Sequence, residues 1–291
     1  MNSFWSRSIQ SADSLFSSRA LRFSPRTRDD FVPFFRLPEG IPILELGCGP
    51  GALASALSGW YPSSKVTAVD RDCSFISYAR EHVPGVTFLE ADILSLPFEN
   101  GSFGACVSNT VSEHVDPVPF YSEQLRVLES GGICLVLSSR KTISVSAPCI
   151  ASETPFEEDV WRRTARLHSD MMHSGGVGAY WQSEAELPLA MERCGFKDVS
   201  TAFTAVDLTP DSPDVSTQEA RSMIESLRLG ELGNIDALPY FARDAVSDGE
   251  LSELRRLVNA RYDERLRLLE SGLRQWDCEI NVIMAVRGVK P

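Results

Sequence analysis

The sequence predicts an α/β protein with a doubly wound, mostly parallel sheet, and three observations support this fold class. From residue 41 onward, apolar segments of strand length alternate with segments that have helical periodicity. A glycine turn at residues 47–51 joins the first strand to the first helix, and acidic residues follow the next two strands. Strands that alternate with helices in this way pair in parallel, with helices on both faces of the sheet.

The individual elements follow from local patterns. The expected strands cover residues 41–46, 65–69, 86–89, 104–108 and 133–138, with helices over 52–60, 73–82 and 121–128. Beyond them, Thr154-Pro155-Phe156-Glu157 is a capping box that predicts an amphipathic helix over 155–172. A helix over 185–194, a strand over 199–206 and a last strand over 280–286 complete the expected sheet.

Two regions lie outside this alternation. Residues 1–36 are rich in aromatic side chains and arginine, and the breaker Pro25 divides them into two expected short amphipathic helices. These helices either pack against the core or form a lid over a ligand. Residues 207–276 contain two helices that begin at Ser216 and Ser247, each with a glutamate three positions later. The sequence leaves open whether they pack on the sheet, over a pocket or against a second copy of the chain in a homodimer.

The glycine turn and the acidic residues indicate a nucleotide-like ligand. The three glycines remove side chains that would keep a ligand off the backbone, and the following helix presents its N–H groups and its positive end. Asp70 ends the second strand, where its carboxylate can accept both hydroxyls of a ribose. Asp92 follows the third strand and can accept a hydrogen bond from an adenine amino group, and Ile93 can pack on the ring.

Composition and charge argue against several classes of protein. With 43% hydrophobic and 23% charged residues among 291, the chain is typical of a soluble globular protein. No apolar run approaches the roughly 20 residues of a membrane helix. The net charge of −12 argues against a nucleic-acid partner. The seven cysteines include no Cys-x-x-Cys pair and the N-terminus has no apolar signal segment, so we expect reduced thiols and a cytoplasmic location.

Further motifs occur at fixed spacing around the predicted ligand site. They are Leu44-Glu45-Leu46 before the turn, Phe75-Ile76 and Ala79-Arg80 after Asp70, Leu96-Pro97-Phe98 and Ser102-Phe103 after Asp92, and Arg126-Val127-Leu128-Glu129-Ser130-Gly131-Gly132. With them, residues 41–138 resemble the class I S-adenosylmethionine-dependent methyltransferases, close to the ubiquinone/menaquinone-type and type 11 groups. The turn reads Gly-x-Gly-x-Gly-Ala, whereas dehydrogenase fingerprints usually read Gly-x-Gly-x-x-Gly.

The chain departs from this family's pattern at three places. Gly104 stands where aspartate is usual, and Glu129-Ser130 replaces the common Lys-Pro before the glycine pair. Arg71 occupies the position that often gives an apolar contact to adenine, so the aliphatic stem of its side chain would have to serve. None of these changes removes a turn glycine or a carboxylate.

The resemblance implies a Rossmann-like, seven-stranded sheet whose last strand is antiparallel and lies between the fifth and sixth strands. It also implies S-adenosylmethionine as the cofactor. The core would comprise residues 37–140, 184–206 and 277–291, with a helical acceptor-site segment at 141–183, the N-terminal lid at 1–36 and the helical insertion at 207–276. The residues expected to bind the cofactor are Glu45, Gly47, Gly49, Gly51, Asp70, Arg71, Asp92, Ile93 and Asn109.

The resemblance further implies methyl transfer to a small organic acceptor, which the acidic chain suggests is neutral or cationic. The reaction is an in-line displacement, so holding the acceptor against the methyl group without water matters most, and a base is needed only if the acceptor must lose a proton. The catalytic candidates are His114, His168 and Tyr180, and the aromatic candidates for an acceptor site are Phe4, Trp5, Tyr180 and Trp181.

Metal and other function classes are less favoured. His168 and His173 are five residues apart, which puts them on different sides of a helix, so no metal site is expected. Two alternatives to an enzyme of this family remain. One is a cofactor-binding regulatory protein without turnover, and the other, which the glycine spacing disfavours, is a nicotinamide-dependent oxidoreductase.

Overall fold

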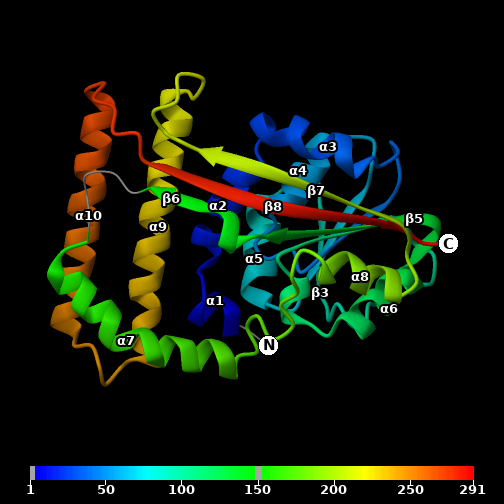
Figure 1. The fold of residues 1–291 in the computed structure, drawn as a ribbon, viewed down its shortest axis with the longest axis horizontal. Helices are drawn as coiled ribbons and strands as arrows, with labels where there is room; N and C mark the ends of the chain where they lie inside the picture. Colours follow the sequence, from blue (N-terminus) through cyan, green and yellow to red (C-terminus); the bar gives the residue numbers. More distant parts are fainter. Residues whose placement is uncertain (1–3, 148–152) are drawn as a thin grey trace.

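The computed structural model describes residues 4–147 and 153–291, and its centre is an eight-stranded sheet (Figure 1). The strand order is β3-β2-β1-β4-β5-β8-β6, and β7 also pairs with β8. The strands are β1 Ile43–Leu46, β2 Val66–Asp70, β3 Thr87–Glu90, β4 Phe103–Asn109, β5 Leu128–Ser139, β6 Val145–Ala147, β7 Lys197–Leu208 and β8 Cys278–Val289. Strands β1 to β5 are parallel, which confirms the predicted fold class.

The last strand confirms the expected topology, and one short strand adds to it. β8 runs antiparallel to both β5 and β7 and lies between them. The eighth strand, β6, was not expected from the sequence. It has three exposed residues and pairs with the start of β8 at Val145 and Ile280. Its exposure explains why no apolar pattern marked it.

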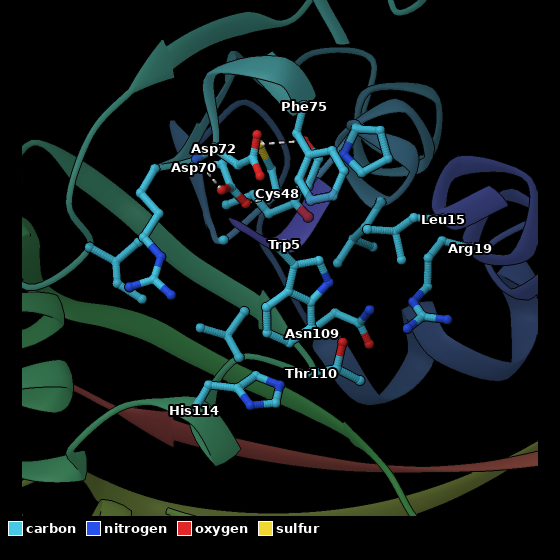
Figure 2. A pocket seen from close by; sticks show the side chains of 18 of the residues that line it. Trp5, Leu15, Arg19, Cys48, Asp70, Asp72, Phe75, Asn109, Thr110 and His114 are labelled. Atoms are coloured by element: carbon cyan, nitrogen blue, oxygen red, sulfur yellow. Dashed lines mark hydrogen bonds between the residues drawn. The ribbon is translucent and has the colours of Figure 1, made fainter. Parts of the chain in front are cut away.

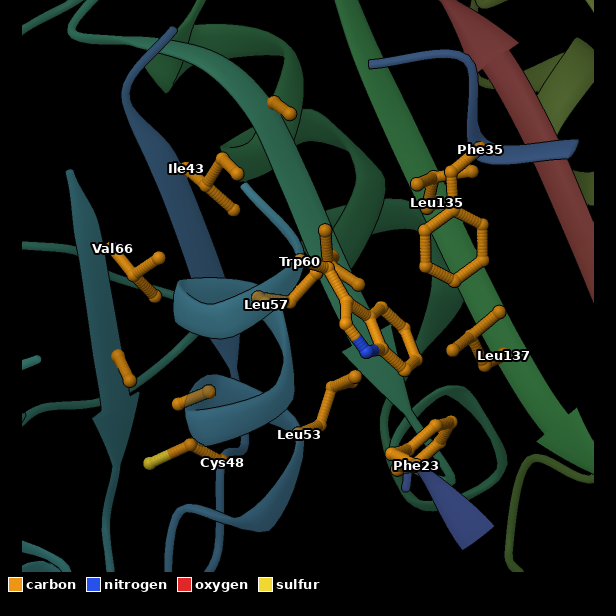
Figure 3. Close-up of a cluster of buried hydrophobic side chains, with 14 of the residues drawn as sticks. Phe23, Phe35, Ile43, Cys48, Leu53, Leu57, Trp60, Val66, Leu135 and Leu137 are labelled. Carbon is orange, nitrogen blue, oxygen red and sulfur yellow. The ribbon is translucent and has the colours of Figure 1, made fainter. Parts of the chain in front are cut away.

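Apolar side chains cover both faces of the sheet because neighbouring strand residues point to opposite sides. On one face, Ile43 and Leu135 pack with α3 (Arg28–Phe35), α4 (Ala52–Trp60) and α5 (Cys73–His82). On the other face, Leu44 and Val136 pack with α6 (Pro117–Val127) and α8 (Glu186–Arg193). Figure 3 shows Trp60 at the centre of the first layer.

The N-terminal residues form three helices where the sequence suggested two. They are α1 (Phe4–Ser8), α2 (Ala12–Arg22) and α3, with a short 3-10 turn at Pro25–Thr27. Pro25 separates α2 from α3 as expected. The additional boundary arises at Ser11, whose hydroxyl accepts a hydrogen bond from the Ser14 N–H and caps α2.

The second half of the chain adds three long helices with an apolar cluster of their own. They are α7 (Pro155–Ser174), α9 (Thr217–Phe241) and α10 (Asp248–Glu270). The predicted capping boxes at Thr154, Ser216 and Ser247 are confirmed. In Figure 1, α9 and α10 stand side by side at one end of the molecule, and α7 runs across their lower ends. Because α9 packs against α2, the insertion leans on the N-terminal helices.

Candidate active site

A cavity of about 240 Å³ lies at the carboxyl ends of β1, β2, β3 and β4 (Figure 2). Parallel α/β sheets bind ligands at this edge. The N-terminal helices close the cavity from the opposite side. Its lining includes Trp5, Leu15, Arg19, Glu45, Gly47, Cys48, Gly49, Asp70, Arg71, Asp72, Phe75, Asp92, Ile93, Asn109, Thr110, Val111 and His114.

The turn between β1 and α4 depends on glycine for packing as well as for conformation. Gly47 has φ +66°, and a Cβ at this position would lie 2.5 Å from a Val111 methyl carbon. Gly51 has φ +92°, and its Cβ would meet the Phe88 ring at 2.9 Å. Both conformations lie in the left-handed region that side chains disfavour. A side chain at residue 47 would therefore displace Val111 in the cavity wall, whereas Gly51 and Phe88 are not among the lining residues.

Asp70 joins the turn to the end of β2. Its Oδ2 accepts a hydrogen bond from the Gly49 N–H and its Oδ1 accepts one from the Asp72 N–H, both at 2.8 Å. Burial raises the pKa of Asp70, and the two backbone hydrogen bonds counteract part of that rise. Each carboxylate oxygen has a second lone pair, so Asp70 can still accept hydroxyl hydrogen bonds from the cavity.

Glu45 and Asn109 bring unpartnered oxygen atoms to the cavity. The Glu45 residue is only 2% exposed, and neither its Oε2 nor the Asn109 Oδ1 has a hydrogen-bond partner in the described part of the chain. Burial, and secondarily the charge of Asp70, raises the pKa of Glu45 well above its usual range. Buried acceptors without donors are costly. A ligand with a positively charged amino group would satisfy them.

The third strand end carries a more open set of side chains. Asp92 is exposed, and its Oδ1 accepts a hydrogen bond from the Leu94 N–H at 2.9 Å. Ile93 lines the cavity beside it, and the exposed Arg71 lines it from the end of β2. This end offers one acceptor and apolar surface, which suits a flat aromatic ring with an amino group.

His114 is the catalytic candidate that the fold brings to the cavity. It ends the short 3-10 helix Ser112–His114 after β4, and its Nδ1 accepts a hydrogen bond from the Gly178 N–H at 2.9 Å. The Trp5 ring of α1 meets the imidazole edge-on, with ring centroids 4.8 Å apart. These contacts orient the ring, so that the neutral form carries its proton on Nε2.

The fold does not bring His168 and Tyr180 to the cavity lining. His168 lies on α7, where its ring packs against Phe241 of α9 with centroids 5.4 Å apart. Tyr180 is 43% exposed, and its backbone N–H donates to the Glu113 carbonyl at 2.9 Å. For His168 the cause is the packing of α7 on α9, whereas Tyr180 lies in the turn after α7 with its side chain largely exposed.

Sequence reasoning missed the contribution of α2 and the α1 tether. Arg19 lines the cavity from α2, and Leu15 of the same helix covers Gly49. Ser6 of α1 is tied to Asp72, its N–H donating to Oδ2 at 3.0 Å and its hydroxyl to Oδ1 at 3.1 Å. The available signal was the (i, i+4) spacing of Leu15 and Arg19, which puts both on one face of a helix.

No group of three or more potential metal-ligating side chains occurs within residues 4–147 and 153–291. Over the same residues, every helix is too short or too polar to cross a membrane.

Comparison with known proteins shows which kind of domain the centre of the chain resembles. The family model for a methyltransferase domain matches residues 44–136. The fatty-acid O-methyltransferase of Mycolicibacterium smegmatis is 35% identical over 106 residues, which are 35% of this chain and 38% of the relative. The trans-aconitate 2-methyltransferase of Rhodopseudomonas palustris is 29% identical over 141 residues, 46% of this chain and 53% of the relative. The chain thus matches only part of the length of these relatives.

A solved structure supports the fold on a larger scale. Phosphoethanolamine N-methyltransferase 2 of Haemonchus contortus aligns with 99% of this chain and 59% of its own, with a TM-score of 0.52 and 16% identity. At this identity the likeness concerns the fold alone.

Proposed function

We propose that this chain, which belongs through residues 44–136 to the class I S-adenosylmethionine-dependent methyltransferases, transfers a methyl group from this cofactor to a small organic acceptor. One observation carries the proposal. The glycine turn lines the same cavity as three hydrogen-bond acceptors, the side chains of Glu45, Asp70 and Asn109. A nucleoside with a charged amino acid tail is the ligand that satisfies all of them.

The residues present fit the cofactor. Asp70 would accept the ribose hydroxyls, and the unpartnered oxygens of Glu45 and Asn109 would accept from the amino group of the methionine part. Asp92 and Ile93 would hold the adenine, with the stem of Arg71 beside them. When bound, S-adenosylmethionine supplies an electrophilic methyl group on a sulfonium sulfur.

The protein would contribute to the reaction by positioning the acceptor and by excluding water from the cavity. Trp5, Val111 and His114 form the wall next to the end of β4, and they would hold the acceptor in line with the methyl group. We propose His114 as the catalytic candidate because its ring lies at the cavity and is oriented by Gly178. It would hold or receive a proton only for an acceptor that must lose one.

The N-terminal helices would act as the lid over the bound cofactor. Leu15 already covers the turn at Gly49, and Ser6 is hydrogen-bonded to Asp72. Opening of this contact would admit the cofactor, and its closure would exclude water.

Small acceptors are supported by the named substrates of two relatives, a fatty acid and trans-aconitate. We also propose a cytoplasmic location without a nucleic-acid partner. In support, Cys48, Cys73, Cys106, Cys134, Cys194 and Cys278 are all unpaired, and the net charge is −12. A homodimer stays a prediction that the mass in solution, from light scattering, tests.

Calorimetric titration of the full chain with S-adenosylmethionine tests the cofactor assignment. We expect Asp70→Asn to weaken binding at least about tenfold, or about 1.4 kcal/mol, because an amide offers one acceptor oxygen instead of two. Asp29→Asn, which changes an exposed aspartate on α3, serves as the matched control. Absence of cofactor binding to the wild type would contradict the proposal.

A panel of small acids, amines, phenols and thiols, with S-adenosylhomocysteine formation as the readout, tests turnover. Formation of this product with any acceptor supports an enzyme. Cofactor binding without product across the panel would instead support a regulatory protein.

A further inference from the structure

A second, smaller cavity adjoins the proposed active site. Its volume is about 50 Å³, well above the roughly 10–15 Å³ that one water molecule needs. It lies between α2, α9 and the strands β7 and β8, and Arg19 lines both this cavity and the larger one. Arg22, one helical turn further along α2, faces the small cavity on the same side of the helix.

The two arginines, Arg22 buried and Arg19 partly buried, lack the carboxylate partners that such arginines normally have. Arg22 is 5% exposed, and its Nε and Nη1 are buried without a hydrogen-bond partner in residues 4–147 and 153–291. For Arg19, the contact of its guanidinium within these residues is a long one, 3.5 Å from Nη1 to the Ser18 hydroxyl. Neither forms an ion pair with a carboxylate there.

Two other arginines, Arg265 and Arg261, show the contrast. Arg265 pairs with both Asp211 and Asp277 at 2.9 and 2.6 Å. Arg261 pairs with Glu157 at 2.9 Å and also with Glu231 of α9. A guanidinium buried without such partners is unfavourable. An unsatisfied one that lines a cavity therefore points to a ligand.

The charges around the small cavity determine what kind of ligand would balance it. Glu279 of β8 lines the cavity, and its Oε1 accepts a hydrogen bond from Asn281 Nδ2 at 2.8 Å. Glu113 is a further carboxyl whose charge acts on both arginines, and it does not line the small cavity. Among the residues that line the small cavity, two arginines and one glutamate therefore carry a formal net charge of one positive.

Burial also lowers the pKa of both arginines, and that of Arg22 falls well below its usual range. Arginine keeps its proton in proteins. The lowered pKa values therefore reflect the cost of desolvating cations whose charge Glu279 and Glu113 offset only in part.

We propose that Arg19 and Arg22 bind a carboxylate of the methyl acceptor, so that the acceptor extends from the main cavity toward β8. A single negative charge balances the site, and the guanidinium fork matches a carboxylate. This inference rests on the proposed methyltransferase function and adds the chemical class of the acceptor. It differs from the neutral or cationic acceptor suggested by net charge, because two guanidinium groups line this cavity.

The test uses the full chain saturated with S-adenosylhomocysteine and calorimetric titration with butyrate, octanoate, dodecanoate and adipate. Each acid is compared with its primary amide and with the alkyl phosphate of the same length. We expect at least one acid to bind, and to bind about tenfold or more tightly than its amide, the scale of losing a charge-assisted contact. Arg22→Met should abolish this preference and leave S-adenosylhomocysteine affinity within about twofold.

Arg166→Met, which alters an exposed arginine on α7 with a 92% exposed side chain, is the matched control and should change neither affinity. Without ligand, Arg22→Met should keep or raise the melting temperature, whereas an arginine with a purely structural role would lower it. If Arg22→Met does not fold, Arg22→Lys, which keeps the charge but loses the fork, should bind the acid with intermediate affinity.

Several results would overturn the inference. The wild type could bind S-adenosylhomocysteine but none of the acids, or it could bind the amides as tightly as the acids. Alkyl phosphates could be the sole ligands that bind, or Arg22→Met could bind the acids with unchanged affinity. A chain that fails to bind S-adenosylhomocysteine would instead contradict the proposed function, so the two failures are distinguishable.

Discussion

Glu45 and Asp70 lie at neighbouring strand ends, and both carboxyl groups are held in an environment that disfavours their charge. Desolvation is the largest cause of the raised pKa in each case. Asp70 recovers part of this cost from two backbone N–H groups, whereas one Glu45 oxygen recovers none within the described residues. The protein thus keeps an unfavourable group where a cationic ligand would relieve it.

Glu45→Gln should reduce the pH dependence of stability. Because its folded pKa is raised, Glu45 contributes stability below its ordinary value of 4.5, and this contribution is lost as the pH rises through the folded pKa. A glutamine stays neutral, so the free energy of unfolding of the variant should fall less as the pH rises above the ordinary value of 4.5. Urea unfolding at a series of pH values measures this, and identical slopes would contradict the assignment.

The same variant should bind S-adenosylhomocysteine more weakly. The amide cannot offer the negative charge that an amino group would pair with. If the variant is more stable than the wild type without ligand but binds S-adenosylhomocysteine more weakly, the effect of Glu45 on stability is separated from its role in binding.

Helix α1 has little packing of its own, so a few side-chain contacts fix its position. No residue of α1 is buried, whereas Ser14 and Arg22 of α2 are. The hydrogen bonds from Ser6 reach Asp72, which also caps α5 by accepting from the Ser74 N–H. A weakly packed element joined to a well-packed one is suited to opening and closing.

Ser6→Ala should loosen the proposed lid without unfolding the protein. It removes one hydrogen bond to Asp72, usually about 0.5–1.5 kcal/mol, so cofactor dissociation should become about two- to tenfold faster. Stopped-flow fluorescence of Trp5, which lines the cavity, can follow this step. Ser24→Ala is the control, since Ser24 makes no capping hydrogen bond, and an effect as large in the control would argue against the tether.

Helix α10 is joined to the sheet by a buried charge cluster. Arg265 binds Asp277, just before β8, and Asp211, just after β7. Asp211 Oδ2 also accepts from the backbone N–H groups of Gln275 and Trp276. The cluster therefore fixes both connections between the insertion and the sheet.

Arg265→Ala should destabilise the protein by about 3–5 kcal/mol, because two buried carboxylates would lose their cation. Urea unfolding measures the change. Arg267→Ala, which removes an exposed partner of Glu264 on the same helix, should cost far less. Equal losses for the two variants would show that helix propensity rather than the charge cluster is responsible.

At the scale of the whole molecule, the sheet and the helical insertion meet through the N-terminal helices. Helix α2 contacts α4 and α5 on the sheet side and α9 on the insertion side. The insertion also has its own apolar cluster, which includes Ile224, Leu254 and Val258. Both cavities are therefore lined by α2, the helix that connects the sheet to the insertion.

S-adenosylhomocysteine should stabilise the entire chain as one unit. At one hundred times its dissociation constant, the free energy of unfolding should rise by about 2.7 kcal/mol. Calorimetry should show a single transition that shifts upward. A second transition that ignores the ligand would mean that α9 and α10 unfold independently of the site.

The features that could be predicted from sequence are those set by near neighbours in the chain. A capping box needs residues three positions apart, as at Thr154 and Glu157, and a strand that is buried on both faces is mostly apolar, as at Ile43 to Leu46, where Glu45 is the exception. The short edge strand β6 carries no such pattern and was missed. The local pattern also does not show that His168 lies away from the cavity lining, because this depends on how α7 packs on α9.

The sequence by itself determined the doubly wound core, the glycine turn and the carboxylates at the strand ends, because each follows from spacing along one or two elements. Only the tertiary structure decided that α2 covers the turn, that Ser6 reaches Asp72, and that Arg19 and Arg22 face cavities instead of solvent. These contacts join residues far apart in the chain, and their burial depends on packing that no local pattern records.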